Sequence, residues 1–401
     1  MKRTPRAALA LLGLTATLAL GACGSDDDSD TTSAASGGDA PAASSGPFVS
    51  TQAATAFKDV TGLDAFDKVA TKAELESRIA QYKQVPSKLL QDEPVSKKAE
   101  PGKTIALLVC GVPVCAEFNS AAKEAADAIG WKTERIDLGT SPEEFAQAYD
   151  RAIELKPDLV VGSGLSRELF DKQLKTLASM KIPVIEWSSG IKPIDGELYV
   201  STDDPLYEAA GIQAAEFIAA DGDMKADVAV FNVPQYTMST LVAKTLADYL
   251  PKMCDGCKAS YEEAAATDIG KLGPKVSGYI QQHPDTKYIV CSFGDLCQGV
   301  GQALKTAGRS DVKVFTRDPG STNLQNIASG TEWATSPLPI GQTGWQIIDL
   351  AQRIFNGDDT AKTRLAPLQI VDAVPDAKSP LVGAVPDYKE QYKTLWKVAA
   401  R

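Results

Sequence analysis

Few residues of this 401-residue chain are suited to covalent or acid–base chemistry. His283 is the single histidine, so a serine or cysteine nucleophile would depend on this one imidazole as its base. It stands in a Gln-His-Pro-Asp stretch between a predicted helix and a predicted strand, where an exposed connector is typical. The sequence also lacks the G-x-S-x-G, Walker and HExxH motifs. We therefore expect a protein that is not an enzyme and that needs neither a cofactor nor a metal.

The seven cysteines divide into one single residue and three close pairs. Cys23 stands alone, and the pairs are Cys110-Cys115, Cys254-Cys257 and Cys291-Cys297. Six cysteines allow fifteen pairings, but the three local disulfides are favoured because short loops close at the least entropic cost. The CxxC spacing of Cys254-Cys257 leaves two alternatives open, a zinc site and a redox-active dithiol. Zinc would need two more ligands nearby, and this pair follows a predicted helix end instead of preceding a helix.

The N-terminus resembles a bacterial lipoprotein signal peptide. Lys2, Arg3 and Arg6 precede an apolar run at 7–20, which is too short to span a bilayer comfortably. The run ends in Leu-Gly-Ala-Cys, similar to a lipobox, so we expect lipidation of Cys23. The alternative is an ordinary cleaved signal peptide. Residues 1–22 would be the leader, and the Ser-, Asp- and Gly-rich residues 23–46 a disordered tether.

Export of the chain would bring it into an oxidising compartment, where disulfides persist. We expect it at the outer face of the bacterial cytoplasmic membrane, in the periplasm or at the cell surface. The formal net charge of −11 offers no basic surface for nucleic acid or for anionic lipid. Contact with the membrane is therefore expected through the lipid anchor alone.

Beyond residue 103, short apolar runs alternate with amphipathic helical stretches. The predicted strands are at 105–109, 131–138, 159–161, 182–185 and 198–200, and then at 228–231, 288–290 and 312–315. Such alternation indicates right-handed βαβ crossovers and parallel sheets. The two series predict an α/β fold with two doubly wound, Rossmann-like lobes. Ligands of such sheets bind beyond the carboxyl ends of the strands, so a cleft between the lobes, closed by a hinge, is the expected site.

Several stretches resemble the type I periplasmic binding proteins, specifically the ribose-binding-like, sugar-type solute receptors of ABC importers. They are Lys-Ile-Pro-Val-Ile at 181–185, Val-Ser-Thr-Asp-Asp at 200–204, the helix at 299–308, and Gly-Thr-Glu-Trp-Ala-Thr-Ser-Pro at 330–337. The resemblance implies discontinuous lobes, which we divide into 103–202 with 319–336 and 203–318 with 337–370. Residues 47–102 would be an N-terminal extension packed on the first lobe, and 371–401 a tail packed on both lobes. It also implies a monomeric, lipid-anchored receptor that passes a small molecule to ABC permease subunits.

The family's polar ligand residues are mostly replaced. Ser188 and Ser189 stand where the family usually has an Asp-Arg pair, and only Asp318 matches its hydroxyl-binding aspartate. We therefore expect a ligand that is less hydroxylated, flatter or more apolar than a free hexose, although aromatic rings also stack on sugars. The candidate ligand residues are Phe118, Glu186, Trp187, Ser188, Tyr236, Phe293, Asp295, Asp318 and Trp333.

Two functions remain as alternatives to import. The same fold could serve as a ligand-sensing subunit of a membrane kinase or chemoreceptor, and a surface enzyme is the less favoured reading. The disulfides at 110–115 and 291–297 would border the ligand and stiffen its loops, whereas the one at 254–257 would be a structural staple.

Overall fold

The computed structural model describes residues 48–398, apart from 112, 140, 164–166 and 375–381. The expected leader, the lipidation site Cys23 and the tether at 23–46 lie outside these residues. Within the described part of the chain, every helix is too short or too polar to cross a membrane.

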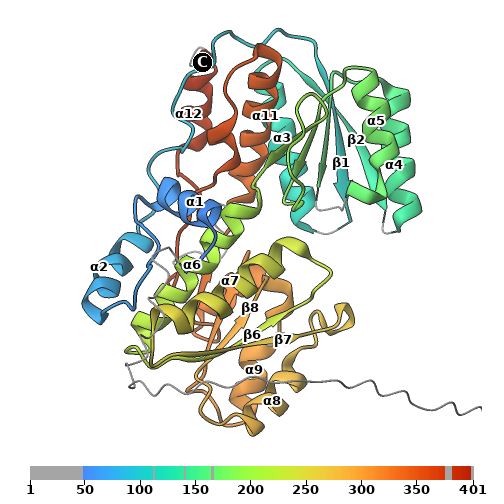
Figure 1. Ribbon diagram of the computed structural model, residues 1–401. Coiled ribbons are helices and arrows are strands. Elements are labelled where there is room, and N and C mark those ends of the chain that lie inside the picture. Colours follow the sequence, from blue (N-terminus) through green and yellow to red (C-terminus); the bar gives the residue numbers. More distant parts are fainter. Residues whose placement is uncertain (1–47, 112, 140, 164–166, 375–381, 399–401) are drawn as a thin grey trace, which may run out of the picture. The chain divides into compact units, whose positions relative to one another are not determined.

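The first lobe is built on a five-stranded parallel sheet (Figure 1). Its strands, in the order β2-β1-β3-β4-β5, are β1 (Thr104–Cys110), β2 (Lys132–Gly139), β3 (Leu159–Ser163), β4 (Val184–Trp187) and β5 (Leu198–Ser201). One face is covered by α3 (Pro113–Ala128), α11 (Ile340–Asn356) and α12 (Tyr388–Leu395), and the other by α4 (Pro142–Leu155) and α5 (Asp171–Ser179). The central strands are apolar because both faces are buried.

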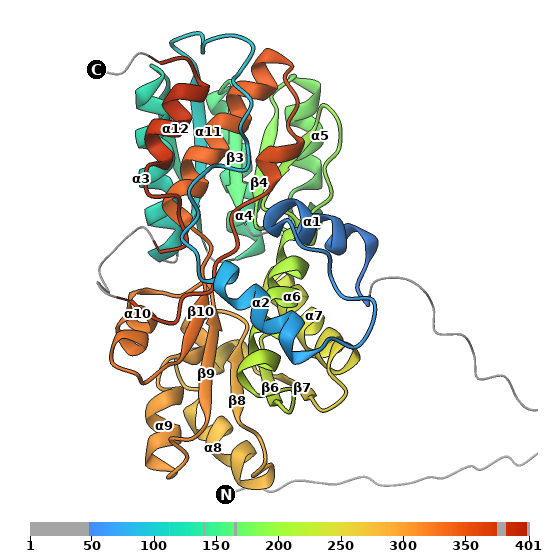
Figure 2. The ribbon, with the colours of Figure 1, turned by 90° about the vertical axis from the view of Figure 1, so that its left-hand side faces the viewer.

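The second lobe repeats this arrangement with the order β10-β9-β8-β6-β7, which Figure 2 shows. Its strands are β6 (Asp227–Asn232), β7 (Lys258–Glu263), β8 (Tyr288–Cys291), β9 (Lys313–Arg317) and β10 (Ala334–Ser336). The helices α6 (Asp204–Asp221) and α7 (Thr237–Met253) cover one face, and α8 (Gly273–Gln282) and α9 (Val300–Thr306) the other. The helix α10 (Ser321–Ala328) connects β9 to β10. The predicted α/β fold with two doubly wound lobes is confirmed.

The chain passes between the lobes close to the carboxyl edges of both sheets. It does so from β5 into α6, from β10 into α11, after the short 3₁₀ helix η4 (Ala361–Arg364), and once more before α12. Two of these passages lie side by side, because the Thr202 amide donates to the Arg364 carbonyl at 3.1 Å.

Part of the predicted division of the lobes is wrong. Residues 319–336 were assigned to the first lobe, yet β10 pairs in parallel with β9 of the second sheet. Residues 337–370 were assigned to the second lobe, yet α11 packs along α3, where Trp345 is buried in the first-lobe core. Strand pairing and burial decide the lobe, and the order of elements along the chain does not show them.

The N-terminal extension contains α1 (Thr51–Thr61) and α2 (Lys72–Tyr82). Both helices pack on α6 of the second lobe, which corrects the expectation that the extension packs on the first lobe. Its later part, from Ser87 onward, contacts the first lobe.

All three local disulfides are present, Cys110–Cys115, Cys254–Cys257 and Cys291–Cys297. The first begins at the last residue of β1 and the third at the last residue of β8, so each constrains a loop at the carboxyl edge of its sheet. The second follows α7 and lies in the second-lobe core.

Candidate ligand-binding site

Polar side chains from both lobes meet at the carboxyl edges of the two sheets, beside the segments that connect the lobes. Ser188 follows β4, and its hydroxyl lies 2.7 Å from the Tyr207 hydroxyl and 3.2 Å from the Thr202 hydroxyl. Tyr207 belongs to the first turn of α6, so this contact joins the first lobe to the second. Burial raises the pKa of Tyr207, and its hydroxyl therefore stays neutral at physiological pH.

Arg317 is a buried cation at the carboxyl end of β9. The residue is 1% exposed, its guanidinium lies over the Tyr207 ring at 5.6 Å, and its Nη1 donates to the Ser336 carbonyl. The same Nη1 lies 2.9 Å from Asp318 Oδ1. Burial raises the pKa of Asp318, while the positive charge of Arg317 opposes that rise. A charged pair thus stands where the second sheet meets the first lobe.

This charged pair has unused hydrogen-bonding capacity. Among the described residues, Arg317 Nε and Nη2 and the Ser336 hydroxyl are buried and have no hydrogen-bond partner. Nε and Nη2 form one edge of the planar guanidinium, which binds two neighbouring acceptor oxygens side by side. Buried donors without partners are costly, so a ligand or ordered water is needed to satisfy them.

The loop after β4 touches the second lobe. Gly190 has φ +66°, and a Cβ there would lie 2.9 Å from Thr237 Cγ2 and 3.3 Å from Met238 Sδ. These two residues begin α7, so the loop and the helix leave no room for a side chain at this glycine.

An aromatic pair lies at the carboxyl edge of the second sheet. Tyr236 precedes α7 and is 48% exposed, and its ring meets Phe293 edge-on at 5.4 Å between ring centroids. Asp295 lies in the next turn, is exposed, and accepts a hydrogen bond from Gln298 at 2.8 Å. The position of these three residues agrees with the sequence prediction, and their contact with a ligand stays a prediction.

Phe118 and Trp187 are at the predicted edge but in the core. Their rings stack at 4.3 Å and are 4% and 5% exposed, within the first-lobe cluster. Burial on both sides leaves little of either ring for a ligand in this structure.

Glu186 lies on the face of the first sheet opposite to Trp187 and Phe118. It is fully buried, and the Tyr149 hydroxyl donates to its Oε1. Burial raises the pKa of Glu186 to about 8, so the carboxyl is mostly protonated at neutral pH. Its Oε2 has no partner among the described residues. Glu186 therefore belongs to the interior of the first lobe instead of the polar junction.

The prediction for Trp333 is wrong. This residue precedes β10 and lies at the amino-terminal edge of the second sheet, stacked on Phe217 at 4.7 Å with Lys313 over its ring. Parallel strands present ligands at their carboxyl edge, the opposite end. Reading Trp333 as part of a crossing segment placed it wrongly.

Sequence reasoning missed Arg317 and Tyr207. Arg317 ends the otherwise uncharged stretch Val-Phe-Thr and stands directly before Asp318, and an arginine at the end of a buried strand was the available signal. No sequence signal distinguished Tyr207 from the core residues of α6.

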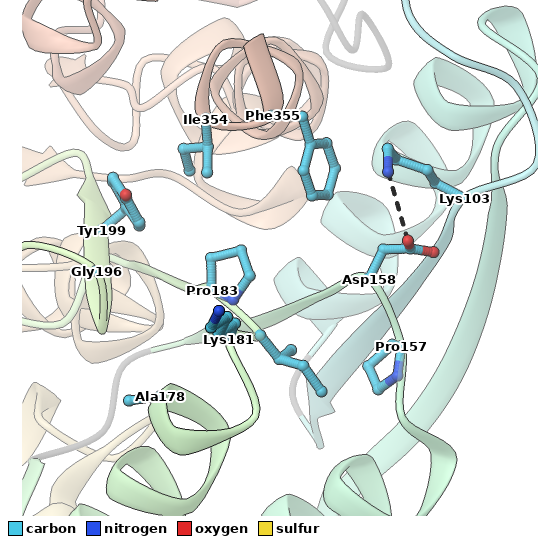
Figure 3. Close-up of a pocket in the computed structure, with 11 residues that line it drawn as sticks. Lys103, Pro157, Asp158, Ala178, Lys181, Pro183, Gly196, Tyr199, Ile354 and Phe355 are labelled. Carbon is cyan, nitrogen blue, oxygen red and sulfur yellow. Dashed lines mark hydrogen bonds and ion pairs between the residues drawn. The ribbon is translucent and has the colours of Figure 1, made fainter. Parts of the chain in front are cut away.

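A hollow of about 660 Å³ lies elsewhere, at the amino-terminal edge of the first sheet (Figure 3). Its wall includes Lys103, Asp158, Lys181, Tyr199 and Phe355. Lys103 is already paired with Asp158 at 3.4 Å and lies over the Phe355 ring at 4.3 Å. The charges of Lys103 and Asp158 therefore offset each other, whereas the Arg317 edge at the junction keeps donors without a partner among the described residues.

Comparisons with known proteins agree with this geometry. A family model described as a periplasmic binding protein domain matches residues 109–359. The ribose import binding proteins RbsB of Salmonella typhimurium and Escherichia coli K12 are each 23% identical over 269 residues, 66% of this chain and 88% of theirs.

Two solved structures share the fold. A 5-methylthioribose transporter solute-binding protein from Thermotoga lettingae has a TM-score of 0.61 at 14% identity, covering 77% of this chain and 100% of its own. A periplasmic ribose ABC transporter protein from Conexibacter woesei has a TM-score of 0.60 at 18% identity, covering 69% and 94%. The chain therefore belongs to the periplasmic binding protein family, as a type I member of the ribose-binding type.

Proposed function

We propose that this protein is a lipid-anchored, extracytoplasmic receptor that captures one sugar-like solute between its lobes and passes it to the permease of an ABC importer. The observation that carries the proposal is the buried Arg317 edge with two unpartnered donors, beside Asp318, at the junction of the lobes. The relatives support the importer role, because those reported above are binding components of transporters and not enzymes.

The chemistry of the junction favours a hydroxylated ligand. Arg317 supplies donors to two adjacent oxygens, and Asp318 accepts the proton of a hydroxyl group. Tyr236, which is exposed, and Phe293, which is half-buried, add an apolar surface suited to the carbon face of a ring. Together they fit an amphipathic sugar or cyclitol, which is closer to a sugar than the aromatic residues alone suggested.

Burial of Phe118 and Trp187 and the position of Trp333 remove most of the support for a flat apolar ligand. A sensing role for the same receptor would use the same ligand site. Deletion of the cognate permease distinguishes the two roles. Uptake of the ligand requires the permease, whereas a cellular response to the ligand through a sensor survives its loss.

Calorimetric titration tests the proposal. We expect one member of a panel of pentoses, hexoses, cyclitols, nucleosides and aromatic compounds to bind with a stoichiometry of one. Arg317→Met removes two charge-assisted hydrogen bonds, each contributing about 1.5–3 kcal/mol, so it should weaken binding by about 100-fold or more.

Lys313→Met on the same strand is the matched control, because Lys313 pairs with Asp221 at the far edge of the sheet. It should leave the affinity unchanged. Equal affinities of wild type and Arg317→Met, with both proteins folded by circular dichroism, would contradict the proposed anchor.

A further inference from the structure

We infer that residues 48–103 form a strap that fastens the two lobes to each other and limits how far they separate. A role of the strap in ligand capture rests on the proposed function, whereas its limit on the separation of the lobes does not. The whole strap precedes the family match, which begins at residue 109. Figure 2 shows the chain leaving α2 in the second lobe and continuing into the first.

The first half of the strap is anchored in the second-lobe core. Phe57, Leu75 and Tyr82 are 0–2% exposed and share one apolar cluster with α6 and α7. Full burial of side chains of this size stabilises the contact by about 1.5–3 kcal/mol each. This half is therefore an integral part of the second lobe.

A buried ion pair fixes the same half. Arg78 Nη1 lies 2.9 Å from both carboxylate oxygens of Glu216 in α6, and Glu216 is fully buried. The hydroxyls of Tyr82 and Tyr249 donate to the same carboxylate, the latter at 3.0 Å. The guanidinium also lies over the Phe66 ring at 4.0 Å. Every lone-pair direction of Glu216 thus has a donor, which fixes α2 against α6.

The second half of the strap is anchored in the first lobe. Leu89 and Val95 are buried in the cluster that contains Trp396, and the Val95 amide donates to the Leu395 carbonyl at 3.0 Å. Arg353 of α11 donates to the Glu93 carbonyl at 2.6 Å. These contacts fasten the strap to the terminal helices of the first lobe.

Only four residues, 83–86, separate the two anchors. The Tyr82 carbonyl accepts a hydrogen bond from the Ile370 amide at 2.7 Å. The next residue, Val371, pairs with β10 of the second lobe. The Ser87 carbonyl accepts from Gln391 of α12 at 2.9 Å. The intervening chain is largely exposed, with Val85 at 57%.

A five-step stretch of backbone spans at most about 17 Å, so the anchors cannot move farther apart than this. Wider separation of the lobes at this side requires the loss of one anchor, with its buried apolar groups and its ion pair. The strap therefore adds a short connection to the crossings from β5, from β10, after η4 and before α12.

The test lengthens the strap without disturbing its anchors. Ten Gly-Ser residues inserted between Val85 and Pro86 relieve the limit, and the same insertion between Pro284 and Asp285, exposed in a second-lobe loop, is the control. Spin labels at Lys175 in α5 and Lys305 in α9, both exposed, report the interlobe distance without ligand. We expect a longer and broader distance distribution for the strap insertion alone.

Identical distributions in wild type, strap insertion and control would overturn the strap, as would equal broadening by both insertions. Because the labels report lobe separation directly, this outcome is independent of whether a sugar binds. If a sugar does bind, the strap insertion should also change its affinity, whereas a failed ligand panel would count against the proposed function alone.

Discussion

At the residue scale, two buried ionisable groups have different environments and different roles. Arg317 keeps free donors beside Asp318 at the junction of the lobes, whereas Glu186 faces Tyr149 inside the first lobe. A strand alternates its side chains between two faces, so neighbours in sequence point to opposite sides of the sheet. Trp187 and Glu186 illustrate this, since the first packs with Phe118 and the second with Tyr149.

Glu186 makes the stability of the fold depend on pH. Burial raises the pKa of Glu186 to about 8 from the ordinary value of 4.5. The folded state therefore holds a proton that the unfolded state loses above pH 4.5, and stability falls as pH rises from about 4.5 to 8. Glu186→Gln cannot ionise, so its free energy of unfolding should rise relative to wild type by up to about 1.4 kcal/mol per pH unit.

Urea denaturation of both proteins at pH 5, 6.5 and 8 measures this difference. The advantage of the glutamine variant should grow with pH across this window and level off above pH 8. If the free energies of unfolding of the two proteins differed by the same amount at all three pH values, Glu186 would ionise in the folded protein as readily as in the unfolded one.

The sequence was informative about the polar junction only in part. Asp318 and Ser188 were identified through the resemblance, because each stands where the family has a polar ligand residue. The contact of Ser188 with Tyr207 depends on how α6 packs against the loop after β4, which no local pattern records.

At the element scale, the strands and helices follow local rules that the sequence shows. Ser141 caps α4 and forms a capping box with Glu144, as the Ser-Pro-Glu-Glu stretch predicts. The failure concerned the segments that form β10 and α11, because each belongs to the lobe opposite to the one expected. Their assignment depends on long-range pairing with β9 and packing on α3.

The disulfides differ in what they constrain, and this gives an element-scale prediction. Cys291–Cys297 encloses Phe293 and Asp295, whereas Cys254–Cys257 lies after α7. All four cysteines are at most 5% exposed, so the pairs are matched for burial. Replacing either pair by alanine should cost about 2 kcal/mol of stability through the lost loop constraint.

Ligand affinity separates the two variants. Loss of Cys291–Cys297 should weaken binding, because the loop that carries Phe293 and Asp295 must then be ordered at the moment of capture. Loss of Cys254–Cys257 should leave affinity unchanged. Calorimetry on both variants checks this, and an equal loss of affinity in both would remove the proposed role of the loop.

At the scale of the whole molecule, the polar junction around Arg317 and the strap at 48–103 have complementary roles. In the proposed function, the carboxyl edges of both sheets supply the ligand contacts, and the segments that connect the lobes set how these edges approach one another. The strap adds a short connection anchored by Arg78 and Glu216 on one side and by Val95 on the other. Ligand contact and lobe separation are therefore controlled at different places in the chain.

The most direct test of this account is a crystal structure of the protein with the tightest-binding member of the sugar panel. We predict a single ligand between the lobes, with two adjacent oxygens within hydrogen-bonding distance of Arg317 Nε and Nη2 and a hydroxyl on Asp318. A ligand seated instead in the hollow beside Lys103 and Lys181, or one that leaves the Arg317 edge without a partner, would contradict the account.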